Sequence, residues 1–144
     1  MEERAVEAAA SLSWFFLSNS VSVNMYVNAL KLHYIRGRDI KEFKNFQEIF
    51  CEVTSDGYNS LKDVLEKRIK LIARGSSLII ITGDLGSEDA RAFEAIKEMG
   101  YDIVLIFISD EELEDDIKSV LSNSEIRMYF VTSESDIKGV LESK

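Results

Sequence analysis

Apolar residues in the first half of the chain follow two different spacings. A helical spacing predicts a helix over residues 3–18, with apolar side chains along one face. This predicted stripe consists of Val6, Ala9, Ala10, Trp14 and Leu17. Residues 21–34 then alternate between apolar and polar positions around a short break, which predicts an antiparallel hairpin. Helical spacing returns over residues 40–51 and 60–73 and predicts two further helices.

The second half alternates unbroken apolar runs with amphipathic segments. Runs over residues 77–82 and 102–109 are apolar on both faces, which is typical of strands in a covered parallel sheet. A shorter run predicts a third strand over residues 127–132. The amphipathic segments predict helices over residues 87–99, 110–122 and 135–144. The pattern therefore predicts an α/β fold: a three-layer sandwich with a mostly parallel sheet, one antiparallel hairpin and helices on both faces.

Composition narrows the classes of function. A chain of 144 residues without repeats or linkers is expected to form a single domain over residues 1–144. The net charge of −9 argues against binding nucleic acid or an anionic membrane surface, since both need clustered Lys and Arg. No apolar run reaches the ~20 residues of a membrane span, so we expect no membrane segment. Cys51 is the one cysteine, which excludes an internal disulfide and suits a cytoplasmic protein.

The best candidate for a functional site is Asp84, which directly follows a buried strand. Ligands of open α/β sheets bind outside the carboxyl ends of the strands, where Asp84 is expected to lie. Asp56, Asn59 and Ser60, in the loop before a predicted helix, would line the same rim. Ordinary turn and capping chemistry also accounts for all four residues, so both interpretations stay open.

The other reactive side chains have structural interpretations. His33 lies on a predicted hairpin strand and Cys51 at a helix end, and neither has a partner motif in the sequence. An acidic run over residues 110–116 suits the start of a predicted helix, because the helix dipole favours carboxylates there. The sequence has no nucleotide-binding glycine motif, and we predict no catalytic residues.

Four segments resemble a von Willebrand factor A-type domain. The chain is most similar to the bacterial branch, a domain of unknown function, that is encoded beside MoxR-type AAA+ ATPases. The segments that carry the resemblance are RAVEAAASLSWFFLSNS, IRGRD, DGYNSL and SSLIIITGDLGSEDARAFEAIKEMGYDIVLIFI.

The resemblance implies a metal-ion-dependent adhesion site at the carboxyl ends of the strands. The family builds this site from an Asp-x-Ser-x-Ser motif on the first strand, a Thr in a later loop, and an Asp after the fourth strand. This chain matches the last piece with Asp84 and offers Asn59 or Ser60 in the loop, while the first strand and its motif are absent. The resemblance therefore implies a truncated domain with a degenerate site. Asp84 would be the remaining ligand if Mg²⁺ bound there, and no other cofactor is expected.

These observations predict a non-enzymatic protein-interaction domain. A rim around Ser60 and Asp84 would dock a partner protein, and the resemblance implies that this partner is a MoxR-type AAA+ ATPase. One alternative is a Mg²⁺-dependent Rossmann-like hydrolase that uses Asp84, and another is a purely structural oligomerising fragment. Because a missing central strand leaves strand edges unpaired, a homodimer formed by edge pairing or swapping is a further expectation.

Overall fold

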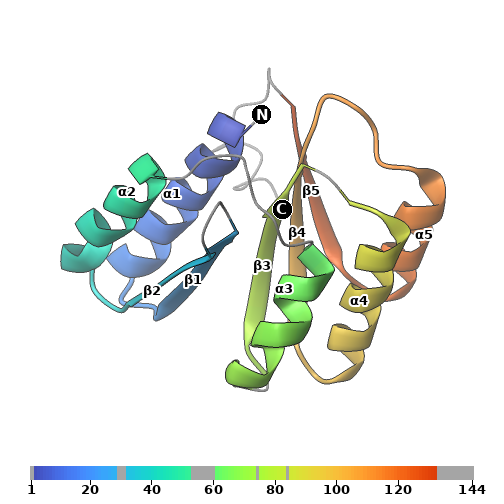
Figure 1. The fold of residues 1–144 in the computed structure, drawn as a ribbon, viewed down its shortest axis with the longest axis horizontal. Helices are drawn as coiled ribbons and strands as arrows, with labels where there is room; N and C mark the ends of the chain where they lie inside the picture. The colour runs from blue at the N-terminus through green and yellow to red at the C-terminus, as the bar shows by residue number, and fades with distance from the viewer. Residues whose placement is uncertain (1, 29–31, 53–60, 74, 84, 133–144) are drawn as a thin grey trace. The chain divides into compact units, whose positions relative to one another are not determined.

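The computed structural model describes residues 2–28, 32–52, 61–73, 75–83 and 85–132. The chain divides into two compact units, residues 2–60 and residues 61–144. The strands of the described residues fall into a two-stranded antiparallel sheet and a three-stranded parallel sheet (Figure 1). The α/β class predicted from the sequence, with a parallel sheet and an antiparallel hairpin, is confirmed.

The N-terminal unit packs two helices against the hairpin. Strands β1 and β2 pair antiparallel, with Val23 opposite Gly37 and Met25 opposite Ile35. Gly37 is buried, and a β-carbon built on it would lie 2.9 Å from the Phe46 ring, so this strand needs glycine where α2 crosses it. The elements of this unit are α1 (Glu2–Ser18), β1 (Val23–Asn28), β2 (Leu32–Gly37), the 3₁₀ turn η1 (Ile40–Glu42) and α2 (Phe43–Glu52).

The buried face of α1 differs from the predicted stripe. Ala8, Ser13 and Leu17 are the buried positions, and Leu17 is 1% exposed as predicted. Trp14 was predicted to face inward, but it is 54% exposed, and its neighbour Phe15 is 57% exposed. The helix is apolar around most of its circumference, so spacing alone does not select the face that packs.

The C-terminal unit is built on a parallel sheet in the order β3-β4-β5. Ile80 lies opposite Leu105, which lies opposite Met128 on the third strand. The elements are α3 (Leu61–Arg68), η2 (Ile69–Leu71), β3 (Ser77–Thr82), α4 (Ser87–Glu98), β4 (Asp102–Ile108), α5 (Asp115–Asn123) and β5 (Arg127–Val131).

Helices α3, α4 and α5 cover one face of this sheet (Figure 1). Two successive right-handed crossovers that advance in the same direction place both connecting helices, α4 and α5, on the same side. Phe93 of α4, Leu121 of α5 and Leu105 of β4 are fully buried in the resulting core. The opposite face also carries buried side chains, among them Ile106, Ile108 and Val131.

The predicted helix over residues 110–122 begins later than expected, since α5 starts at Asp115. Leu113 is 5% exposed within the core, and the Glu111 N–H donates to Ser109 Oγ at 3.0 Å. These two interactions hold residues 109–114 as a loop. Among the described residues, no helix is both long and apolar enough to cross a membrane.

Candidate functional site

The four residues predicted to form the rim lie outside the described residues. Asp56, Asn59 and Ser60 fall within residues 53–60, and Asp84 is also not described. Their convergence therefore stays a prediction. The immediate neighbours of Asp84, Gly83 and Leu85, are described, and they lie at the carboxyl end of β3.

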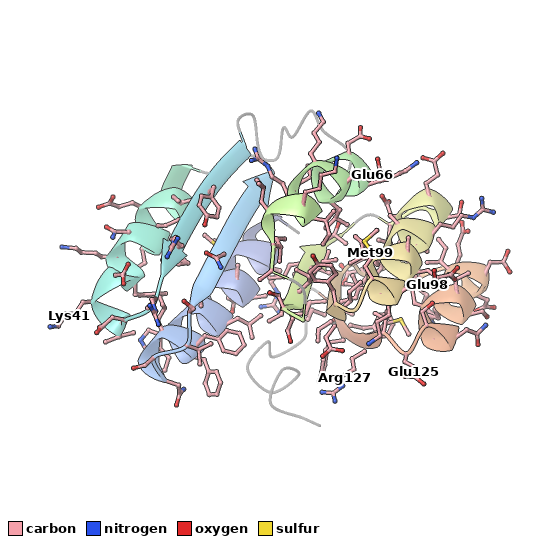
Figure 2. All side chains as sticks on the ribbon, turned by 90° about the horizontal axis from the view of Figure 1, so that it is seen from below. Lys41, Glu66, Glu98, Met99, Glu125 and Arg127 are labelled. Atoms are coloured by element: carbon pink, nitrogen blue, oxygen red, sulfur yellow. The ribbon has the colours of Figure 1, made fainter. Side chains whose placement is uncertain are left out.

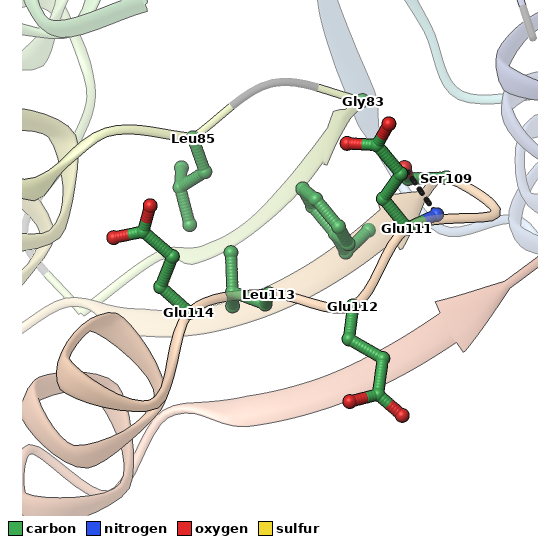
Figure 3. A pocket seen from close by; sticks show the side chains of 8 residues that line it. Gly83, Leu85, Ser109, Glu111, Glu112, Leu113 and Glu114 are labelled. Atoms are coloured by element: carbon green, nitrogen blue, oxygen red, sulfur yellow. Dashed lines mark hydrogen bonds between the residues drawn. The ribbon is translucent and has the colours of Figure 1, made fainter.

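A hollow of about 180 Å³ lies at this carboxyl end (Figure 3). The loops that follow β3 and β4 form its walls, which is where ligands of parallel α/β sheets bind. The residues that line it are Gly83, Leu85, Phe107, Ser109, Glu111, Glu112, Leu113 and Glu114.

Gly83 fixes the distance between the two strand ends. A β-carbon built on Gly83 would lie 2.7 Å from the carbonyl oxygen of Ile108, the last residue of β4. Real β-carbons essentially never approach a backbone oxygen so closely, so a side chain here would push the two loops apart. The Gly83 position thus has a structural role that follows from backbone packing.

Hydrogen bonds and apolar contacts hold the second wall of the hollow. The Ser109 N–H donates to the Val131 carbonyl at 3.0 Å, and Ser109 Oγ accepts from the Glu111 N–H. Leu85 and Leu113 are buried at 7% and 5% exposure and belong to the same apolar cluster. The backbone of both walls is therefore anchored in the core, while the polar side chains stay at the surface.

On the far side of the hollow, α4 begins with a capping interaction. The Gly86 N–H donates to Asp89 Oδ2 at 2.9 Å, and the Ala90 N–H donates to the Gly86 carbonyl. A carboxylate in the first turn also interacts favourably with the helix dipole. The segment that follows Asp84 is therefore a regular helix start.

The glutamates of the hollow are exposed, and their carboxylates do not converge. Figure 3 shows the side chains of Glu111 and Glu114 pointing to the same side from separate parts of the loop, and that of Glu112 pointing to the opposite side. Magnesium requires an octahedral set of oxygen ligands that converge on one point. The described residues contain no group of three or more His, Cys, Asp or Glu side chains placed to hold a metal ion. Asp84, the ligand that the resemblance implies, lies outside the described residues, so the Mg²⁺ site stays a prediction.

Sequence reasoning assigned these glutamates to the start of a helix and missed their position at the hollow. The pattern Glu-Glu-Leu-Glu contains one signal that was available, because Leu113 interrupts a run of acids. A lone apolar residue within an acidic run is expected to be buried, as Leu113 is, which places the adjacent glutamates beside the core.

A second hollow, of about 420 Å³, lies where α4 and α5 end, near the amino-terminal ends of β4 and β5. Glu98, Met99, Glu125 and Arg127 gather at this end of the unit (Figure 2). Its lining mixes charges, and Lys97 Nζ lies 3.0 Å from Asp102 Oδ1. The residues that line it are Glu94, Lys97, Glu98, Asn123, Ser124 and Glu125.

No protein-family model matches the chain, and the comparison with curated proteins gives no match. Among solved structures, the chain is similar to a hydrogen sulfide-producing enzyme in complex with an alpha-aminoacrylate intermediate, at 16% identity and a TM-score of 0.39. The similarity covers 91% of this chain and 38% of that chain, so this chain spans well under half of that enzyme's length. A likeness at this level carries no argument about the site.

Proposed function

We propose that this protein is a non-enzymatic docking domain that binds a partner protein at the carboxyl ends of β3 and β4. The observation that carries the proposal is the hollow beside Gly83, with its anchored walls and exposed carboxylates. Asp84, which lies between Gly83 and Leu85 in the sequence, belongs to this rim in the proposal.

The size of the hollow favours docking over enclosure of a small substrate. Small-molecule sites are typically clefts of about 300–1,000 Å³ that bury most of the ligand. The hollow of about 180 Å³ is smaller than this range, and its glutamate side chains are exposed. Such a surface suits a side chain or loop of another protein that inserts from outside.

The charge of the rim favours a basic partner surface. Five acids lie within residues 111–116, and the ion pairs found among the described residues involve none of them. Unpaired surface carboxylates cost little in water, and they steer a partner that carries Lys and Arg. The resemblance to the von Willebrand A branch supports a MoxR-type AAA+ ATPase as that partner.

The proposal includes docking without a metal ion. An adhesion site of the family type needs several oxygen ligands around the cation, and the described carboxylates of the hollow do not converge on one point. In the proposal, Asp84 acts as a rim carboxylate rather than as a metal ligand.

Charge reversal at the two hollows tests the proposal with a matched control. The test variant is Glu111→Lys/Glu112→Lys/Glu114→Lys, and the control variant is Glu94→Lys/Glu98→Lys/Glu125→Lys at the second hollow. Both variants replace three glutamates with lysines and change the net charge equally. A difference in binding between them therefore reports the position of the charges and not the net charge. The binding of each to a purified MoxR-type ATPase from the same genome is measured by calorimetry, in EDTA and in Mg²⁺.

We expect the test variant to bind at least about tenfold more weakly than wild type, and the control to stay within about twofold. Equal losses in both variants would contradict docking at the carboxyl-terminal hollow. Binding that requires Mg²⁺ would contradict the metal-free mode and would favour an adhesion-type site at Asp84.

A further inference from the structure

The second half of α1 (Glu2–Ser18) presents an exposed aromatic surface. Trp14 and Phe15 are 54% and 57% exposed, while Ser13 and Leu17 on the other side of the helix are buried. The Phe15 ring lies edge-on to that of Phe16, with centroids 5.6 Å apart. Two adjacent aromatic rings that are more than half exposed are unusual for a surface that faces only water.

This surface also lacks charge. Residues 8–30 contain no Asp, Glu, Lys, Arg or His, although 30% of the chain is charged. The exposed positions of the other helices carry charged side chains, among them Lys44, Glu48, Glu66, Glu88, Arg91, Glu94, Asp115 and Asp116. Two copies of a chain with a net charge of −9 repel each other, and the α1 surface lets them meet without opposing carboxylates.

The exposed residues of α1 have a self-complementary order. From residue 8 to the end of the helix, exposed side chains occur as Ser11, Trp14, Phe15 and Ser18: two large residues in the centre and one small residue at equal distance on each side. The exposed Glu7 lies one turn before this group. A two-fold contact requires that residue i meets residue j of the partner and that j meets i. In an antiparallel pair centred between Trp14 and Phe15, these two residues meet each other across the axis, and Ser11 meets Ser18.

We propose that α1 is a homodimerisation surface on which a second copy of this chain packs its own α1 antiparallel, through Trp14 and Phe15. The serines at either end leave room for the aromatic rings of the partner, as ridges of one helix enter grooves of the other. The contact is independent of the hollow at the carboxyl ends of β3 and β4, because no residue of α1 lines that hollow.

Sedimentation velocity over a concentration series tests the dimer. Wild type, Trp14→Glu and Phe15→Glu are compared with Leu71→Glu, which places the same charge at a residue of η2 that is 69% exposed. We expect wild type and Leu71→Glu to shift from monomer to dimer between about 10 µM and about 1 mM, and both aromatic variants to remain monomeric. A wild type that stays monomeric, or an aromatic variant that still dimerises, would overturn the proposal.

Cysteine pairing tests the geometry with both aromatic rings intact. Ser11→Cys and Ser18→Cys are made separately in a Cys51→Ser background and oxidised alone or mixed. Positions 11 and 18 should meet across the axis, whereas identical positions are displaced by about 10 Å along the helix, beyond the ~7 Å Cα distance that a disulfide allows. We expect disulfide-linked dimers mainly in the mixture, and efficient linking of Ser11→Cys to itself would overturn the antiparallel arrangement.

Discussion

At the scale of single residues, Gly83 connects the fold to the site. Its backbone lies so close to the Ile108 carbonyl that a β-carbon would sit 2.7 Å from the oxygen. This contact sets the spacing between the loops after β3 and β4, and hence the shape of the hollow. The role depends on packing between two strands distant in sequence, so the sequence indicated only a turn.

Replacing Gly83 with alanine tests this role. We expect Gly83→Ala to lower the free energy of unfolding by about 1–3 kcal/mol, because the added methyl group overpacks against backbone that cannot rotate away. Gly86→Ala is the control, since its β-carbon would lie 3.8 Å from Asp89 Oδ2, and loss of glycine at the start of α4 should cost less than about 1 kcal/mol. Guanidinium chloride unfolding measures both, and equal costs would contradict the packing argument.

Other residue-scale predictions had mixed outcomes. Leu17 is buried as the helical spacing predicted, whereas Trp14 of the same predicted stripe is exposed. Three consecutive aromatic residues cannot all point to one side of a helix, and the sequence did not show which would pack. The rim residues Asp56, Asn59, Ser60 and Asp84 stay predictions because they lie outside the described residues.

At the scale of elements, the parallel strands were the most predictable part of the chain. Expected strands over residues 77–82, 102–109 and 127–132 correspond to β3, β4 and β5 within one residue at each end. A short unbroken apolar run is typical of a parallel strand that is covered on both faces, so the sequence predicts such strands well. The start of α5 was wrong by five residues, because burial of Leu113 and the bond between Glu111 and Ser109 outweigh the helix-favouring acids.

Tyr101 links two of these elements and offers a test of their connection. Its ring is buried, and its hydroxyl donates to the Ile72 carbonyl at 2.8 Å, which ties the end of η2 to the start of β4. We expect Tyr101→Phe to lower the free energy of unfolding by about 1–2 kcal/mol, because the carbonyl loses its partner. Tyr34→Phe is the control, because the Tyr34 hydroxyl donates to Asn24 in an exposed position. Thermal melts measure both variants, and equal losses of stability would contradict the prediction.

At the scale of the whole molecule, two surfaces differ in their charge. The net charge of −9 includes the acidic rim of the hollow, while residues 8–30 carry none. The α/β class followed from the sequence, whereas the division into units of residues 2–60 and 61–144 did not, because contacts distant along the chain define it. The prediction of a single domain over residues 1–144 stays a prediction.

Salt is expected to affect binding at the two surfaces differently. Raising NaCl from about 50 mM to about 500 mM shortens the Debye length severalfold and should weaken binding of a basic partner about tenfold. The same change should leave dimerisation through α1 unchanged or strengthen it, because only repulsion between copies is screened. Calorimetry and sedimentation in the same buffers measure both, and salt-insensitive partner binding would contradict an acidic docking surface.

The most direct test of the docking proposal is hydrogen exchange of the chain with and without the MoxR-type ATPase, in EDTA. The account predicts slowed exchange in residues 83–86 and 109–114 and no change in residues 97–102 and 122–127 around the second hollow. Unchanged exchange at residues 109–114, or protection confined to the second hollow, would contradict docking at the carboxyl ends of β3 and β4.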